Sequence, residues 1–239
     1  MLVGNPICTS DAPALELKVR PTRYSHAMFY VDRISKISGD RNSLIDEFLR
    51  RSLKANFSHR FCLHMIVVTG DQKLLITKRA PKGAEEKNKW SASAEEQLAP
   101  RDFADGPNRV VLRWADRLLS EELAIPPSAY SPESVRILTV FLEAHNLNMS
   151  LCGYAKLRTK AEDLEKHLRA SPKFQPSATD QEYTDLAFLE LGKDALLDQI
   201  FSPTYEWHAS SRYRLLYSLL KNFGEPTKED LATFLRARC

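Results

Sequence analysis

Two pairs of adjacent glutamates are the residues of this sequence whose types and spacing best suit chemistry. Glu95 and Glu96 lie in a polar segment, and Glu121 and Glu122 lie near the end of a segment with helical periodicity. Arg117 precedes Glu121 by four residues, so a helix would place both side chains on one face. Carboxylates that converge from two segments can hold a divalent metal ion. Chemistry at these residues therefore requires a fold that brings the two segments together.

Residues 117–125, which read RLLSEELAI, resemble the second half of the Nudix box. The family pattern is G-x5-E-x7-R-E-U-x-E-E-x-G-U, where U is a bulky aliphatic residue. Arg117, Leu119, the two glutamates and Ile125 stand at matching positions. The order of segments over residues 60–201 is also similar to that of the family. A hairpin that ends in Lys-Arg-Ala is followed by a tryptophan segment, the helix and further strands.

The resemblance implies an α+β fold, in which a Nudix-like mixed sheet lies between helices. It also implies hydrolysis of a nucleoside diphosphate linked to another moiety, with Mg²⁺ or Mn²⁺ as the cofactor that bridges the phosphates and activates water. The catalytic residues would lie on the helix and in a late acidic turn: Arg117, Glu121, Glu122 and Glu182. The metal ligands would be the two glutamate pairs: Glu95, Glu96, Glu121 and Glu122. Asp185 is an alternative to Glu182 in the late turn.

The box is incomplete, and this leaves a second interpretation open. Family members carry a glutamate directly after the arginine, where this chain has Leu118, and their late glycine is Ala124 here. The earlier family glutamate falls on Arg109, and a loop at 93–96 replaces the family's glycines. In the alternative, Leu118 belongs to an apolar stripe with Trp114. The chain is then a nucleotide-sensing or protein-interaction module without turnover.

Three further residues are candidates for contact with a substrate. Lys78 and Arg79 end a predicted strand at a place where Nudix proteins often direct basic residues at phosphates, although an exposed strand end explains them equally well. Trp90 is suited to stacking on a nucleobase, although aromatic residues are more often part of the core. His64 and His145 lack the spacing of metal ligands, so we expect structural roles for both.

Hydrophobic periodicity predicts the elements that position these residues. A hairpin with a tight turn at Gly70–Asp71 spans 60–80, and a helix spans 108–125. Strands are predicted at 135–145, 149–159 and 184–191, and helices at 161–170, 194–201, 210–223 and 229–238. The N-terminal residues predict strands at 15–21 and 27–34 and a helix at 41–57. We expect an N-terminal α/β extension (1–58), a Nudix-like domain (59–204) and a C-terminal helical segment (205–239).

Composition limits the partners and the compartment of the protein. The 239 residues include 34 basic and 31 acidic side chains, a balance that gives no strong signal for nucleic-acid binding. No apolar run approaches the roughly 20 residues that cross a bilayer, and the start does not resemble a secretory signal. The four isolated cysteines are expected to be reduced in a cytoplasmic protein. We expect a nucleotide-derived small molecule as ligand, and a homodimer or protein partner is possible through the terminal extensions.

Overall fold

The computed structural model describes residues 7–8, 15–16, 60–81, 86–143, 148–176 and 181–223. Two short strands, β1 (Ile7–Cys8) and β2 (Leu15–Glu16), pair antiparallel, and β2 falls at the start of the strand predicted at 15–21. The strand predicted at 27–34 and the helices predicted at 41–57 and 229–238 lie outside the described residues. The division at 58/59 and 204/205 therefore stays a prediction.

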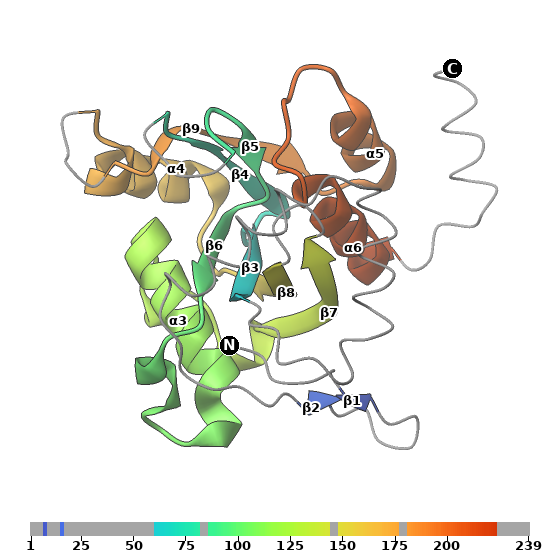
Figure 1. The fold of residues 1–239 in the computed structure, drawn as a ribbon. Coiled ribbons are helices and arrows are strands. Elements are labelled where there is room, and N and C mark those ends of the chain that lie inside the picture. The colour runs from blue at the N-terminus through green and yellow to red at the C-terminus, as the bar shows by residue number, and fades with distance from the viewer. Residues whose placement is uncertain are drawn as a thin grey trace, which may run out of the picture. The chain divides into compact units, whose positions relative to one another are not determined.

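A seven-stranded sheet forms the centre of the fold, and the expected α+β class is confirmed. The strand order is β5–β4–β3–β8–β7, while β6 pairs with β3 and β9 pairs with β4 (Figure 1). The strands are β3 (Phe61–Val68), β4 (Lys73–Arg79), β5 (Trp90–Ser91), β6 (Ala94–Gln97), β7 (Arg136–Glu143), β8 (Asn148–Lys156) and β9 (Tyr183–Glu190). The predicted hairpin is confirmed as β3 and β4. All eight residues of β3 are buried, which explains its nearly continuous apolar sequence.

The described ranges contain four α-helices besides the sheet: α3 (Val110–Leu123), α4 (Ala161–Ala170), α5 (Lys193–Phe201) and α6 (Ser211–Phe223). Each lies within one or two residues of a predicted helix, apart from the first turn of α3, where Pro107–Arg109 form a 3₁₀ turn. Leu118 is completely buried, so the apolar stripe expected on α3 includes it. No helix in the described part of the chain has the length and apolar composition needed to cross a membrane.

The chain divides into two compact units. The first comprises residues 1–63, 97–114 and 140–151, and the second comprises 64–96, 115–139 and 152–239. In the first unit, the rings of Phe61 and Trp114 lie 5.3 Å apart, and the Asn148 amide donates a hydrogen bond to Glu143 at 2.8 Å.

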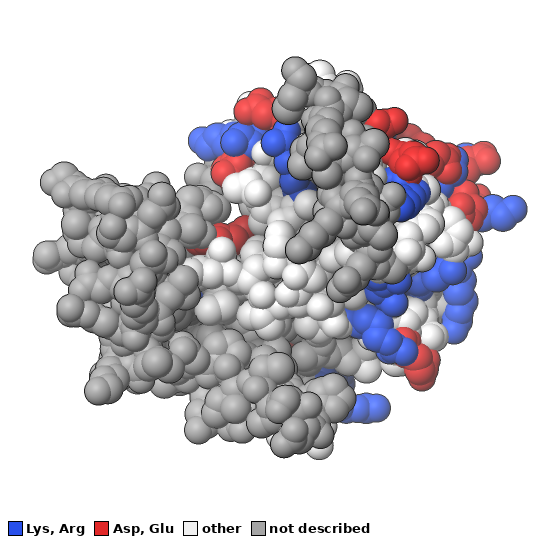
Figure 2. Space-filling model, turned by 90° about the vertical axis from the view of Figure 1, so that its right-hand side faces the viewer, with Lys and Arg blue, Asp and Glu red and all other residues white. Residues whose placement is uncertain are grey.

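The second unit contains β4, β5, β9, α4, α5 and α6, together with the end of α3. Figure 1 shows the end of α3 and α4 to the left of β4, with α5 and α6 to the right. Figure 2, which views the molecule from that right-hand side, shows basic and acidic side chains above and to the right of a central uncharged area. Cys152 is buried and forms no disulfide bond with another described residue, and burial raises the pKa of its thiol to about 12. Cys62, in the first unit, is also buried and has no disulfide bond within the described ranges.

Ser93 fixes the path of the chain into β6. Its backbone has a φ of 63°, in the left-handed region that favours glycine. Its hydroxyl donates a hydrogen bond to the Leu75 carbonyl at 2.8 Å and accepts one from the Val67 N–H at 2.9 Å. The Thr77 hydroxyl donates to the Ser93 carbonyl. One serine thus joins β3, β4 and the start of β6, the strand that carries Glu95 and Glu96.

Helix α3 ends at a second residue in the left-handed region. Ala124, which stands at the glycine position of the Nudix pattern, has a φ of 53°. The N–H of Ile125 donates to the Leu119 carbonyl at 2.8 Å and closes the helix end. The Ala124 carbonyl contacts Nε2 of His167 at 2.7 Å. An L-residue pays a steric cost in this conformation that glycine avoids.

We predict that Ala124→Gly stabilises the protein by up to about 1 kcal/mol, because relief of the left-handed strain exceeds the entropy that glycine adds to the unfolded chain. Urea unfolding followed by circular dichroism measures the change. Ala170→Gly is the matched control: it lies in the last turn of α4 and is expected to destabilise. A loss of stability in Ala124→Gly would contradict the interpretation of this helix end.

Candidate functional site

Charged side chains from α3, β6 and the start of β9 gather in the second unit. Arg117 is 9% exposed, and its Nη1 lies 3.2 Å from Oε2 of Glu96 and 3.8 Å from Oε2 of Glu121. The expected pairing of Arg117 with Glu121 across one helical turn is present. Through the same guanidinium, α3 is joined to β6. One glutamate of each pair, Glu96 and Glu121, therefore interacts with the guanidinium of Arg117.

Glu122 and Glu182 form a contact between two carboxyl groups. Glu122 is 9% exposed, its side chain is hydrogen bonded to that of Glu182, and Oε2 accepts a hydrogen bond from the Tyr183 hydroxyl at 3.4 Å. Burial, the hydrogen bond with Glu182 and the negative charges of Glu182 and Glu96 raise the pKa of Glu122 to about 10. At neutral pH this carboxyl pair therefore holds one proton.

Lys173 and Tyr183 complete the surroundings of the carboxyl pair. Burial opposes ionisation of Glu182, but its hydrogen bonds with Glu122 and with Lys173 outweigh burial and lower its pKa. The backbone N–H of Glu182 donates to the Lys173 carbonyl at 3.0 Å, which holds the two residues together. The Tyr183 ring stacks on Phe174 at a centroid distance of 5.1 Å. Sequence reasoning missed Lys173, for which no local pattern gave a signal, and Tyr183, which directly follows Glu182.

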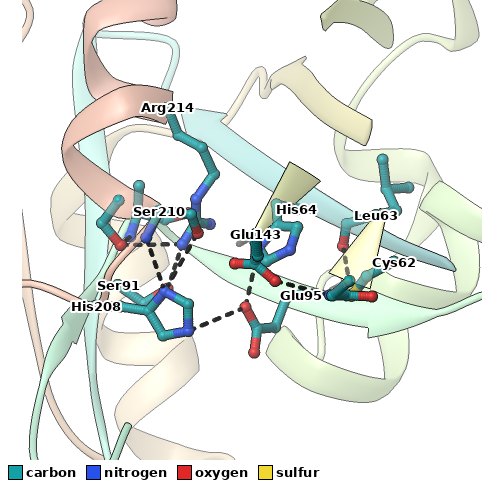
Figure 3. A network of polar contacts seen from close by, with 12 residues as sticks. Cys62, Leu63, His64, Ser91, Glu95, Glu143, His208, Ser210 and Arg214 are labelled. Atoms are coloured by element: carbon teal, nitrogen blue, oxygen red, sulfur yellow. Dashed lines mark hydrogen bonds and ion pairs between the residues drawn. The ribbon is translucent and has the colours of Figure 1, made fainter. Parts of the chain in front are cut away.

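Glu95 has different partners from Glu96. Both glutamates lie in β6, and successive residues of a strand point to opposite faces. Because β6 begins at Ala94, the expectation of a loop at 93–96 is wrong from residue 94 onwards. The reason is the pairing of this segment with β3. Glu95 forms an ion pair with Arg79. Figure 3 shows it beside His64, whose Nδ1 lies 2.9 Å away. Nε2 of His208 lies 3.7 Å from the same Glu95 oxygen.

These partners keep Glu95 ionised. Burial alone would favour the neutral acid, but His64, Arg79 and His208 together hold the pKa of the carboxyl well below its usual range. His64 is therefore more than a packed core residue, since it contacts a charged group of the candidate site. His145 lies outside the described residues.

The other candidates for substrate contact lie along β4 and β5. Lys78 stands opposite Trp90 on β5 and opposite Asp185 on β9. Trp90 is half-buried and packs edge-on against Tyr205 at 5.3 Å. Asp185 pairs with Arg169 at 3.5 Å, so Glu182, rather than Asp185, contacts the glutamates of α3.

The carboxyl groups fit one kind of divalent metal site. Within the ranges that the structure describes, no three His, Cys, Asp or Glu side chains form a group that could hold a metal by themselves. Mg²⁺ usually keeps several waters and takes one or two carboxylates together with substrate phosphates. Glu122 and Glu182 supply two adjacent carboxyl groups whose shared proton a cation can replace. They fit an ion of this type, and they do not form a complete protein cage.

The pKa of Glu122 predicts a pH dependence of stability in metal-free buffer. A pKa raised from 4.5 in the unfolded chain to about 10 in the folded protein means that stability from this group is complete below pH 4.5. It is lost as the pH rises toward 10. We predict that the thermal stability of Glu122→Gln, whose side chain cannot ionise, differs less from that of wild type at pH 5 than at pH 9. At pH 9 the variant is expected to be more stable than wild type.

The control for this comparison is Glu162→Gln, which removes an exposed carboxylate of α4. Thermal unfolding in the presence of a chelator, followed across pH 5–9, gives the three curves. A constant difference between wild type and Glu122→Gln at every pH would show that the Glu122 carboxyl is not held in its neutral form.

No family model matches the sequence, and neither does any curated protein. Solved structures that resemble the chain include Nudix proteins. A NUDIX hydrolase from Alicyclobacillus acidocaldarius is 10% identical, with a TM-score of 0.47 over 69% of this chain and 93% of that one. The NUDIX domain of NrtR from Shewanella oneidensis, solved with ADP ribose, is 13% identical, with a TM-score of 0.45 over 74% and 97%. A MutT NUDIX hydrolase from Burkholderia pseudomallei is 18% identical, with a TM-score of 0.41 over 67% and 98%. At these values the likenesses concern the fold alone.

Proposed function

We propose that this protein is a Nudix-type, metal-dependent hydrolase of a nucleoside diphosphate linked to another moiety. The observation that carries the proposal is the contact between the carboxyl groups of Glu122, which is buried, and Glu182, which is partly exposed. A buried acid held beside a second acid is unfavourable without a cation or a proton between them. Perturbed carboxyl groups of this kind are concentrated at functional sites.

Glu122 and Glu182 are the proposed main ligands of Mg²⁺ or Mn²⁺, with Glu96 and Glu121 beside them. When bound, the ion would neutralise phosphate oxygens and lower the pKa of a bound water. Arg117 keeps Glu96 and Glu121 directed toward one another by pairing with both. Lys173 keeps Glu182 ionised and in place. The chain thereby holds its acidic groups ready before a substrate arrives.

Contacts with the substrate are proposed for three residues of β4 and β5. Arg79 is one-quarter exposed and stands opposite Tyr183, and the N–H of the next residue, Ala80, donates to the Glu182 carbonyl at 2.8 Å. A guanidinium there is suited to a phosphate. Trp90 and Lys78 lie opposite one another and are proposed to contact the nucleotide. Substrate recognition by these residues implies a nucleotide-derived ligand, and a cytoplasmic location is proposed with it.

A second candidate function is binding without turnover. Leu118 occupies the position at which Nudix enzymes carry a further glutamate, and it is completely buried in the core. The helix therefore offers one ligand fewer than the family pattern. In this alternative the same site binds a nucleotide and signals its presence to a protein partner.

We predict that Glu122→Gln lowers hydrolysis of the diphosphate bond by about 100-fold or more, because several kcal/mol of charge stabilisation depend on the metal. The measurement is phosphate release after phosphatase treatment, across a panel of nucleoside diphosphate derivatives with Mg²⁺ or Mn²⁺. Glu165→Gln, an exposed carboxylate of α4, is the matched control and is expected to retain wild-type activity.

Equal activity in Glu122→Gln and wild type would remove the proposed site. Thermal stabilisation of wild type by a nucleotide, without any product, would favour the second candidate, since a ligand that binds only the folded state raises its stability.

A further inference from the structure

Glu95 is enclosed by three nitrogen-bearing side chains. Its Oε2 lies 2.9 Å from Nδ1 of His64 and 3.7 Å from Nε2 of His208 (Figure 3). Its Oε1 pairs with Nη1 of Arg79. Both histidines thus lie near the same Glu95 oxygen, and the Arg79 guanidinium pairs with the other oxygen. These three side chains together fix the orientation of the Glu95 carboxylate.

A backbone hydrogen bond determines which ring nitrogen of His208 carries the proton. Its Nδ1 accepts a hydrogen bond from the backbone N–H of Ser210 at 3.3 Å. Because a backbone N–H can only donate, Nδ1 of the neutral ring carries no proton, and the proton is on Nε2. Nε2 is the atom that faces Glu95. The N–H of His208 also donates to the Trp90 carbonyl at 2.8 Å, which anchors the residue to β5.

The exposed fraction of the side chain increases from the two histidines to Glu95 and Arg79. The side chains of His64 and His208 are 1% and 5% exposed, while those of Glu95 and Arg79 are 21% and 25% exposed. Arg79 stands opposite Tyr183 on β9, and the N–H of the next residue, Ala80, donates to the Glu182 carbonyl at 2.8 Å. Tyr183 in turn donates to Glu122. The guanidinium of Arg79, the most exposed group of the network, is therefore carried by the part of β4 that is joined to the segment of Glu182 and Tyr183.

We propose that Glu95 is a positioning residue that holds Arg79 beside the carboxyl pair to bind a phosphate of the substrate, with His64 and His208 fixing Glu95. In this arrangement Glu95 is not a metal ligand, in contrast to the role expected for it from the sequence. The inference rests on the proposed function, because Arg79 has a diphosphate to hold only if the substrate contains one.

A double-mutant cycle tests the inference with α,β-methylene-ADP, a nucleoside diphosphate whose bridge cannot be hydrolysed. Its affinity for the full-length protein is measured by calorimetry with Mn²⁺, for wild type, Glu95→Gln, Arg79→Ala and the double variant. Each single change is expected to weaken binding by about 10-fold to 100-fold, the range of a charge-assisted hydrogen bond. The double variant is expected to be no weaker than Arg79→Ala, because Glu95 acts through Arg79.

A second readout separates positioning from metal ligation. The affinity for Mn²⁺ alone is expected to stay within about two-fold of wild type in Glu95→Gln and Arg79→Ala, since neither side chain is a ligand in this account. The controls are Glu165→Gln and Arg113→Ala, which remove exposed members of surface ion pairs. Neither control is expected to change either affinity.

His208 provides a conservative rescue. In His208→Leu the polar ring nitrogen that lies 3.7 Å from Glu95 is lost, and the affinity for α,β-methylene-ADP is expected to fall as it does in Glu95→Gln. In His208→Gln an amide N–H can take the place of Nε2–H and is expected to recover most of that affinity. If Glu95→Gln does not unfold cooperatively, Arg79→Ala and the two His208 variants decide the question.

Loss of Mn²⁺ binding in Glu95→Gln, or additive effects of Glu95→Gln and Arg79→Ala, would overturn the inference. Wild-type protein that binds Mn²⁺ but not α,β-methylene-ADP would also overturn it. Wild-type protein that fails to bind Mn²⁺ counts against the proposed function instead. The same cycle, run with α,β-methylene-ADP alone, then still decides the role of Glu95.

Discussion

The contact between Glu122 and Glu182 is the constraint on which the rest of the site depends. Two carboxylates in contact repel each other, and the burial of Glu122 adds to the cost of ionising it. The folded chain meets this with a proton on Glu122 and with Lys173 beside Glu182. The proposed function places a cation at this contact, where it would take the place of that proton.

The surrounding elements divide the charged side chains between two tasks. Because β6 is a strand, Glu95 and Glu96 point in opposite directions and take different partners. Glu96 joins Arg117 on α3, and Glu95 joins Arg79 on β4. Ser93 sets the start of β6 by hydrogen bonding to both strands of the hairpin. The path of one short segment thus positions both the acidic groups and a guanidinium.

Local patterns were sufficient to predict most of the regular structure and part of the site. The hairpin at Gly70–Asp71 and the apolar stripe of α3 follow from short-range periodicity, and the structure confirms both. The pairing of Arg117 with Glu121 follows from helical spacing alone. The resemblance of the late acidic turn to the family pointed to Glu182, which does contact Glu122.

The remaining features depend on contacts between distant segments, which local patterns do not encode. The pairing of β6 with β3 turned an expected loop into a strand and separated Glu95 from Glu96. Lys173 reaches Glu182 only because a 3₁₀ turn after α4 lies against the start of β9. His208 reaches Glu95 through its backbone bond to Trp90, more than a hundred residues earlier. Leu118 shows the opposite case, since helical periodicity alone placed it in the core.

The most direct test of the central claim is anomalous scattering from crystals of the full-length protein grown with Mn²⁺. The account predicts a peak within about 2.1 Å to 2.3 Å of carboxylate oxygens of both Glu122 and Glu182. Crystals that diffract well, contain Mn²⁺ and show these two carboxyl groups still hydrogen bonded to each other, with no peak between them, would contradict it.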